Sequence, residues 1–364
     1  MVSLSKRMST RLRAASIFAA FALLYIAASS LSATGQTFTV KDLGALPGGT
    51  FSVAMGINDH GQIVGESETN GFFPPPDAFL FENGVMEDLG TLPLRALDPF
   101  SEAFGINNHG QIVGDSGDIA RFEFAVLFSN GAIVELPTLP GGSNNNNQAL
   151  AINDHGQIVG VATTASGSSH AFLYQDGATT DLGTLPGGTF SDATGINKHG
   201  QIVGESGTAS GQTHAFLYEN GVMTDLGTLP GGNFSSATGI NKHGQIVGQA
   251  STISGDKHAF LYENGIMTDL GTLPGDTSSS AAAINDRGQI VGTSGFPVEH
   301  AFLFDNGVMI GLPTLPGGTS SQALGINNHG EIVGSSDATN VILHAALWTP
   351  AHEQHEDNED NEDN

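Results

Sequence analysis

Histidines recur in two registers along this 364-residue chain, and each register suggests a different chemistry. In the first, a histidine stands eleven residues before an aspartate. Such a pair supplies two of the three members of a hydrolytic triad. Several near-identical copies argue against a single active site, because an enzyme usually needs one asymmetric place. A buried His or Asp does need a partner. We therefore interpret the pairs as structural polar contacts between packed units: His170–Asp181, His214–Asp225, His258–Asp269 and, from opposite ends of the chain, His344–Asp42.

The second register places histidines in short turns, at His60, His109, His155, His199, His243 and His329. Six copies suggest metal binding, but the expected geometry opposes it. Equivalent atoms on facing sheets lie about 10 Å apart, whereas zinc needs its nitrogen ligands at about 2.0–2.1 Å. The sequence also contains no phosphate-binding loop and no His-Glu-x-x-His motif. We predict neither a metal site nor a cofactor.

These residues belong to a unit that the chain repeats seven times. Each copy reads as four short strands: in one copy they cover Ala237–Asn241, Gln245–Ser251, His258–Glu263 and Ile266–Gly271. An Asn-x-x-Gly turn joins the first two strands, since Asn favours local backbone contacts and Gly supplies a positive φ. Asn264-Gly265 is a typical two-residue hairpin turn. Four antiparallel strands in about 44 residues are typical of a propeller blade.

Counting the units predicts an all-β, seven-bladed β-propeller with four antiparallel strands per blade. An Ile-Asn pair precedes the first turn of each unit, at Ile57, Ile106, Ile152, Ile196, Ile240, Ile284 and Ile326. The N-terminal Phe38–Gly44 matches only a fourth strand, and the last unit stops after its third, at His344–Trp348. We expect Phe38–Gly44 to complete the last blade and close the ring. The alternative, an open β-solenoid, would need capping repeats that the sequence lacks.

The recurring Gly-Ile-Asn, Gly-Gln-Ile-Val-Gly and His-Ala-Phe strings resemble the bacterial extracellular HAF repeat. The triplet stands at His170–Phe172, His214–Phe216, His258–Phe260 and His300–Phe302. Two units depart from it, with Asp77 in place of the histidine in the first and Phe124-Ala125-Val126 in the second. The resemblance covers about Phe38–Pro350. It implies an exported repeat protein and carries over no catalytic residue.

The two ends of the chain differ from the repeats. Residues 1–35 combine a basic start with an apolar run, Ala14–Leu31, and small residues before Gln36, which predicts a secretory signal peptide. An uncleaved anchor is the alternative, since 18 apolar residues are near the lower limit for a membrane span. Residues 36–350 would form the propeller. Residues 351–364 are almost entirely acidic or polar, which predicts a disordered tail.

Net charge limits the classes of partner that the chain could bind, and cysteine content limits how the fold is stabilised. The chain has no cysteine, so no disulfide holds it together. Its formal net charge of −26 would become −30 after loss of residues 1–35, which hold four of its eleven Lys and Arg residues and no acid. That charge disfavours nucleic acids and anionic membranes. We expect a secreted, cell-surface or periplasmic monomer, with no membrane span after signal cleavage and an unknown protein or glycan as its partner.

Three loops break the repeat, and together they form the candidate binding patch. In a propeller, the loops between second and third strands and those between blades emerge on one face. The departing loops are Glu68–Pro76, Leu94–Glu102 and Gly117–Glu123. Exposed aromatics beside arginine are typical of recognition surfaces, and loops on a rigid scaffold often carry function. The candidate residues are Phe72, Phe73, Arg95, Asp98, Phe100, Arg121, Phe122 and Glu123. Drift in tolerant surface loops is the alternative explanation.

Three functions are compatible with this pattern. The near-perfect repetition favours an exported, non-enzymatic scaffold that binds a protein or glycan through one face. A hydrolase or lyase with an axial active site would need one blade to contribute residues that the others lack. A purely structural surface or matrix component would need no unique site at all.

Overall fold

The computed structural model describes residues 36–69, 75–93, 99–118, 122–129, 131–143, 146–339 and 343–351. The chain divides into two units, Met1–Thr37 and Phe38–Asn364. Only residues 36 and 37 of the first unit are described, so the fold below is that of the second. The predicted signal peptide and the stretch 352–364 lie outside the described residues and stay predictions.

The described residues form 28 strands in seven four-stranded antiparallel sheets. Blade 1 contains β2 (Ser52–Ile57), β3 (Ile63–Ser67), β4 (Asp77–Glu82) and β5 (Val85–Asp88). Blade 2 contains β6 (Pro99–Ile106), β7 (Ile112–Asp118), β8 (Phe122–Ser129) and β9 (Ala132–Glu135). Blade 3 contains β10 (Gln148–Ile152), β11 (Ile158–Thr163), β12 (Ser169–Gln175) and β13 (Ala178–Asp181). Blade 4 contains β14 (Ser191–Ile196), β15 (Ile202–Gly207), β16 (Thr213–Glu219) and β17 (Val222–Asp225).

The remaining three blades follow the same order. Blade 5 contains β18 (Ser235–Ile240), β19 (Ile246–Ser251), β20 (Lys257–Glu263) and β21 (Ile266–Asp269). Blade 6 contains β22 (Ser279–Ile284), β23 (Ile290–Ser294), β24 (His300–Asp305) and β25 (Val308–Gly311). Blade 7 contains β26 (Ser321–Ile326), β27 (Ile332–Asp337), β28 (Leu343–Pro350) and, from the other end, β1 (Phe38–Asp42).

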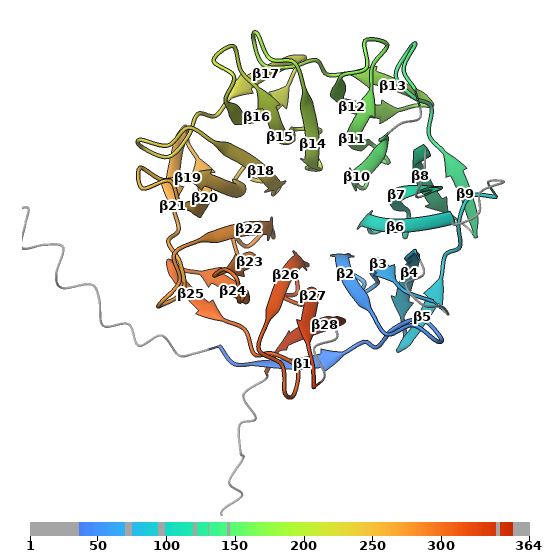
Figure 1. The fold of residues 1–364 in the computed structure, drawn as a ribbon, viewed down its shortest axis with the longest axis vertical. Coiled ribbons are helices and arrows are strands. Elements are labelled where there is room, and N and C mark those ends of the chain that lie inside the picture. The colour runs from blue at the N-terminus through green and yellow to red at the C-terminus, as the bar shows by residue number, and fades with distance from the viewer. Residues whose placement is uncertain are drawn as a thin grey trace, which may run out of the picture. The chain divides into compact units, whose positions relative to one another are not determined.

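The sheets form a closed ring, as Figure 1 shows, with the first strand of each blade nearest the centre. β1 pairs antiparallel with β28, from Phe38 opposite Pro350 to Asp42 opposite Ala346. Trp348 at this seam is completely buried, and its Nε1 donates to the Pro313 carbonyl at 2.7 Å. The predicted seven-bladed propeller, closed by its N-terminal strand, is confirmed.

Local sequence explains why each blade can form. The hairpin turn of blade 1 places Asn83 and Gly84 at φ values of 52° and 82°, as a two-residue primed turn requires. The glycine of each Ile-Val-Gly string lies very close to the backbone of the neighbouring strand. A Cβ on Gly65 would lie 1.9 Å from the Val53 carbonyl oxygen, so no larger residue fits there.

The core consists of seven similar apolar clusters between neighbouring blades. Each cluster combines residues of two blades. In one, Val203 of β15 packs with Ile246 and Phe260 of blade 5, and all three are buried. Burial of a large aliphatic or aromatic side chain contributes about 1.5–3 kcal/mol. The ring is therefore held by a repeated blade-to-blade contact and needs no disulfide.

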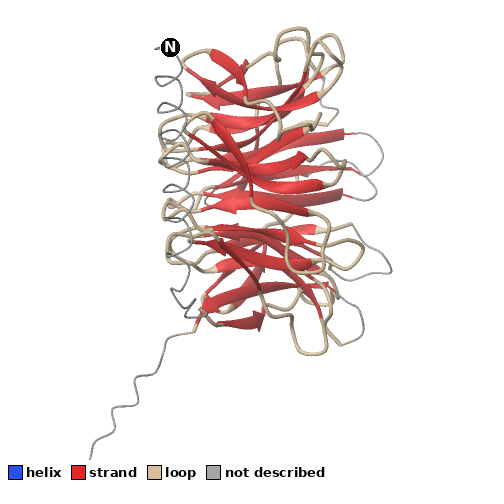
Figure 2. Cartoon of the chain, turned by 90° about the vertical axis from the view of Figure 1, so that its left-hand side faces the viewer, coloured by secondary structure: helices blue, strands red, loops and turns tan. Residues whose placement is uncertain are grey.

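The ring has two faces, which carry different connections (Figure 2). We call the turn face the one with the Asn-x-x-Gly turns and the β4–β5 hairpin and its equivalents. The loop face carries the β3–β4 connection and its equivalents together with the connections between blades. These two kinds of loop meet, as the Thr339 hydroxyl donates to the Pro316 carbonyl at 3.1 Å. The described residues form no helix that could cross a membrane.

Candidate functional site

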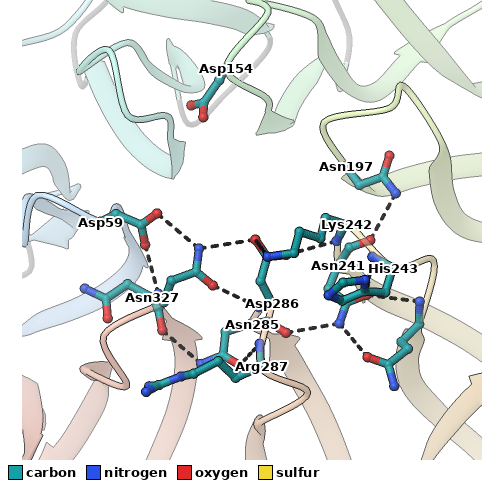
Figure 3. Close-up of polar contacts among 12 residues, drawn as sticks. Asp59, Asp154, Asn197, Asn241, Lys242, His243, Asn285, Asp286, Arg287 and Asn327 are labelled. Atoms are coloured by element: carbon teal, nitrogen blue, oxygen red, sulfur yellow. Dashed lines mark hydrogen bonds and ion pairs between the residues drawn. The ribbon is translucent and has the colours of Figure 1, made fainter.

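A ring of seven buried asparagines lines the turn-face end of the channel. Asn241 shows the pattern: its Nδ2 donates to Gln245 Oε1 at 2.7 Å and to the Asn285 carbonyl of the next blade at 3.1 Å. Its Oδ1 accepts the backbone N–H groups of His243 and Gln245. Figure 3 shows this contact from Asn197 through Asn241 to Asn285. The contact repeats around the whole ring: Asn58, Asn107, Asn153, Asn197, Asn241, Asn285 and Asn327.

The residues that follow these asparagines form a second ring around a pocket of about 310 Å³. They are Asp59, Asn108, Asp154, Lys198, Lys242, Asp286 and Asn328. Hydrogen bonds to Asn328 and Asn108 hold the pKa of the Asp59 carboxyl below its usual value, because they outweigh the opposing effect of burial. Unlike the asparagine ring, this second ring varies from blade to blade. It gives the turn-face end of the channel an uneven charge.

At the other end of the channel, carboxylates gather in blades 1 and 2. Glu66 of β3 and Glu102 of β6 share a hydrogen bond between their side chains across the blade boundary. Asp115 of β7 is only 1% exposed. The Gln148 amide of blade 3 donates to Asp115 Oδ2 at 2.9 Å and to Glu123 Oε1 at 2.6 Å. We call Glu66, Glu102, Asp115 and Glu123 the carboxylate cluster.

The environment of this cluster favours the protonated form of Glu66, Glu102 and Asp115. Burial and the nearby Glu102 raise the pKa of Glu66 to about 7. Burial also raises the pKa of Glu102, and the Glu123 charge adds to that effect. The pKa of Asp115 is raised by burial, by its hydrogen bond with Glu123 and by Glu102. Crowded carboxyls in one site cannot all ionise together. Within the described part of the chain, Asp115 Oδ1 has no hydrogen-bond partner.

A pocket of about 490 Å³ continues the acidic surface into blades 3 and 4. Asp192 of β14 lies opposite Glu205 of β15, and both line this pocket together with Gln148. Burial and the Glu205 charge raise the pKa of Asp192 to about 6. Among the described residues, no Lys or Arg forms an ion pair with Asp192, Glu205 or the carboxylate cluster. Within the described part of the chain, the acids at this end of the channel are therefore not paired with a basic side chain.

Comparison with known proteins supports the fold. A family model described as a protein of unknown function (DUF3466) matches residues 97–228, which span blades 2 to 4. No curated protein matches the chain. Among solved structures, the β-propeller domain of the Trilobed protease from Pyrococcus furiosus, described as having an open velcro topology, is similar. That domain is 9% identical, with a TM-score of 0.55, over 83% of this chain and 96% of the domain.

Two further solved structures are similar to this chain. A puromycin-hydrolyzing peptidase of Mycobacterium tuberculosis is 10% identical, with a TM-score of 0.52, over 84% of this chain and 54% of that one. A puromycin hydrolase mutant is 14% identical, with a TM-score of 0.53, over 82% and 51%. This chain thus covers about half of each of these two proteins. At such low identity the similarity establishes the propeller fold alone.

The predicted His–Asp pairs make close contacts in the structure. His170 Nδ1 lies 2.9 Å from Asp181 Oδ1. His214–Asp225, His258–Asp269 and His344–Asp42 repeat the contact. Each of the first three pairs joins the third and fourth strands of one blade rather than two blades. The aspartate also accepts the N–H of the following glycine, as Asp181 does from Gly183 at 2.8 Å. The pair therefore anchors the start of the connection to the next blade.

Asp77 changes this contact in blade 1. It stands where blades 3 to 7 have a histidine, eleven residues before Asp88, and both aspartates line a pocket of about 450 Å³. Burial and the Asp88 charge raise the pKa of Asp77. In this blade, two carboxyls replace a His–Asp pair.

The predicted binding patch is only partly described. Phe72, Phe73, Arg95, Asp98 and Arg121 lie outside the described residues, so their role stays a prediction. Phe122 is 45% exposed, and its ring centroid lies 6.2 Å from that of Phe124. Glu123 belongs to the carboxylate cluster.

Phe100 stands in a repeated position, which sequence reasoning missed. Like Phe51 and Phe190, it directly precedes a serine of the innermost strand. Its ring packs over Gly117, as the Phe190 ring packs over Gly207. Phe100 therefore packs within its blade as Phe190 does, and its role in binding stays a prediction.

The carboxylates at the channel were also missed, except for Glu123. Alignment of the seven units would have revealed them. The residue after Ile-Val-Gly is Glu66, Asp115, Val161, Glu205, Gln249, Thr293 or Ser335. Its cross-strand partner is Val53, Glu102, Gln148, Asp192, Ser236, Ser280 or Gln322. Acids occupy these positions in blades 1, 2 and 4 alone.

Sequence reasoning also missed exposed apolar residues of the loop face on the other side of the ring. Ile253 and Phe296, in the β19–β20 and β23–β24 connections, are each 84% exposed. Within the described residues, no group of three or more His, Asp or Glu side chains is close enough to hold a metal ion. The described loop face thus combines buried acids with exposed aromatic and aliphatic side chains.

Proposed function

We propose that the protein is an exported, non-enzymatic scaffold that binds a cationic partner, a protein or a glycan, through its loop face over blades 1 and 2. The observation that carries this proposal is the carboxylate cluster. It departs from the repeat where the loops of blades 1 and 2 do, and it has no cationic partner among the described residues. A positively charged group would offset the mutual repulsion that, in addition to burial, raises the pKa values of Glu66, Glu102 and Asp115.

Exposed apolar residues also favour the loop face as the binding surface. Recognition surfaces combine charged groups with aromatic side chains that bury well. Phe122 is next to Glu123 of the cluster, and Ile253 and Phe296 are exposed on the loop face in blades 5 and 6. A partner with both basic and apolar groups would therefore complement the loop face in charge and hydrophobicity. The placement outside the cytoplasm rests on the signal-like residues 1–35, and N-terminal sequencing of the mature protein tests it.

The binding test compares two variants, each with three carboxyls replaced by amides. Glu102→Gln, Asp115→Asn and Glu123→Gln together neutralise three loop-face acids. Their matched control replaces three glutamates that accept hydrogen bonds from glutamines of the turn face, Glu82→Gln, Glu219→Gln and Glu263→Gln. The probes are a labelled oligolysine peptide and a chitosan oligosaccharide, and the readout is fluorescence anisotropy.

We expect one of the two probes to bind the unaltered protein and the control variant with similar affinity. The loop-face variant should bind it about tenfold more weakly or worse, since a charge-assisted contact contributes about 1.5–3 kcal/mol. Equal weakening in both variants would indicate nonspecific attraction to an acidic protein. No binding of either probe would favour the purely structural role.

An axial hydrolase or lyase is a second candidate, because Glu66 and Glu102 form a carboxyl pair with raised pKa values near the channel. Catalytic acids and bases often have such shifted values. The test incubates the protein with a panel of oligosaccharides and detects products by mass spectrometry. Turnover that Glu66→Gln abolishes would favour the enzyme over the scaffold.

A further inference from the structure

The second ring at the turn face is held by a contact that passes from each blade to the next. In five blades the backbone N–H of the ring residue donates to the side-chain oxygen of the ring residue in the following blade. Asp59 thus donates to Asn108 Oδ1 at 2.9 Å, and Asn108 to Asp154 Oδ1 at 2.8 Å. The same bond runs from Lys242 to Asp286, from Asp286 to Asn328 and from Asn328 to Asp59.

Two adjacent positions break this ring. The residue that should accept the Asp154 N–H is Lys198, and the one that should accept the Lys198 N–H is Lys242. A lysine side chain is a donor only. Within the part of the chain that the structure describes, these two N–H groups have no acceptor. They belong to residues that line the axial pocket of about 310 Å³.

The charges around the gap favour an anion. Lys242 Nζ is 3.3 Å from Asp286 Oδ2, whereas Lys198 forms no ion pair with any described residue. The nearest fixed acid on the ring, Asp154, is engaged by blade 2, since its two oxygens accept the N–H and the side-chain amide of Asn108. In three of the five blade-to-blade contacts of this ring, the acceptor is a carboxylate oxygen.

We propose that the gap between blades 3, 4 and 5 binds a small carboxylate, whose oxygens take the places that Asx side chains fill elsewhere in the ring. The Asp154 and Lys198 N–H groups donate to the carboxylate, and the Lys198 ammonium supplies the positive charge. Charge-assisted bonds of this kind are stronger than neutral ones. The pocket volume is at the lower end of the range for small-molecule sites, about 300–1,000 Å³. This site lies at the opposite end of the channel from the proposed partner surface and is independent of it.

The first experiment uses the unaltered protein. Uniformly ¹⁵N-labelled protein is titrated with sodium glucuronate and, separately, with glucose, at constant ionic strength in a chloride-poor buffer. We expect saturable shifts of the Asp154 and Lys198 amide signals with glucuronate and none with glucose. Equal shifts with both sugars, or shifts spread over all the Asn-x-x-Gly turns, would overturn the proposal.

The second experiment repairs the ring. Lys198→Asn restores an acceptor for the Asp154 N–H, and Lys242→Asn restores one for the Lys198 N–H. Each variant should weaken glucuronate binding by about tenfold or more, because it fills one donor and removes one positive charge. Lys257→Asn is the control, since Lys257 lies over the Phe234 ring away from the axial pocket. Unchanged binding in the repaired variants, or equal weakening in the control, would contradict a site in the gap.

Discussion

Replacement of Glu66 by glutamine tests the electrostatics of the carboxylate cluster. The fold raises the pKa of this carboxyl from 4.5 to about 7, mainly by burial and then by the charge of Glu102. The folded protein therefore holds the proton more tightly than the unfolded chain does. The contribution of Glu66 to the free energy of unfolding should fall as the pH rises from about 4.5 to about 7, and this contribution should be constant outside that window. At about 1.4 kcal/mol per pKa unit, the loss reaches on the order of 3 kcal/mol.

Glutamine keeps the shape of the side chain and cannot ionise. Glu66→Gln should therefore match the unaltered protein at pH 4 and be more stable at pH 8.5, by on the order of 2–3 kcal/mol. Urea denaturation followed by tryptophan fluorescence measures both, because the only tryptophan, Trp348, is buried in the ring seam. Glu82→Gln is the control, since it removes the same charge from an exposed position. A gain that is equal at both pH values, or a loss at pH 8.5, would refute the reasoning.

Three further changes test the scaffold. Asp77→His should restore a His–Asp contact with Asp88 and raise the free energy of unfolding by about 1 kcal/mol at pH 7, and an unchanged urea midpoint would contradict this. Asn241→Ala should lower the free energy of unfolding by about 3 kcal/mol, because buried backbone groups lose their hydrogen-bond partners. A loss no larger than that caused by alanine at an exposed position would argue against the asparagine ring. Thr39→Cys with Thr349→Cys, whose hydroxyls lie 2.8 Å apart across the ring seam, should form a disulfide that stabilises by about 2–4 kcal/mol. Failure to oxidise would count against a closed ring.

The fold was predictable because the sequence repeats its structural signals. Seven Ile-Asn pairs, each followed by a turn and an Ile-Val-Gly strand, determine seven blades. The unequal ends of the chain predict the pairing of β1 with β28, since Phe38–Gly44 lacks the other three strands of a blade. The His–Asp spacing likewise follows from hairpin register, because an Asn-Gly turn fixes which residues stand opposite one another.

The candidate site was less predictable, because its important residues lie at positions where the repeat is weakest. Glu102 and Asp115 become neighbours only through the register of β6 and β7, and Gln148 reaches them from the next blade. The gap at Lys198 was equally hard to predict, because it can be recognised only by comparison with the Asp or Asn side chains that five other blades place at this position. Comparison of equivalent positions, rather than a search for motifs, reveals both features.

The position of a bound cation tests the central claim most directly. The protein is labelled with ¹³C, and its side-chain carboxyl signals are followed by NMR during titration with oligolysine at pH 7.5. The account predicts saturable shifts of Glu102, Asp115 and Glu123, while Glu82, Glu219 and Glu263 on the turn face stay unchanged. Shifts of similar size on both faces would show that the acidic surface attracts cations without a site, and would contradict the proposal.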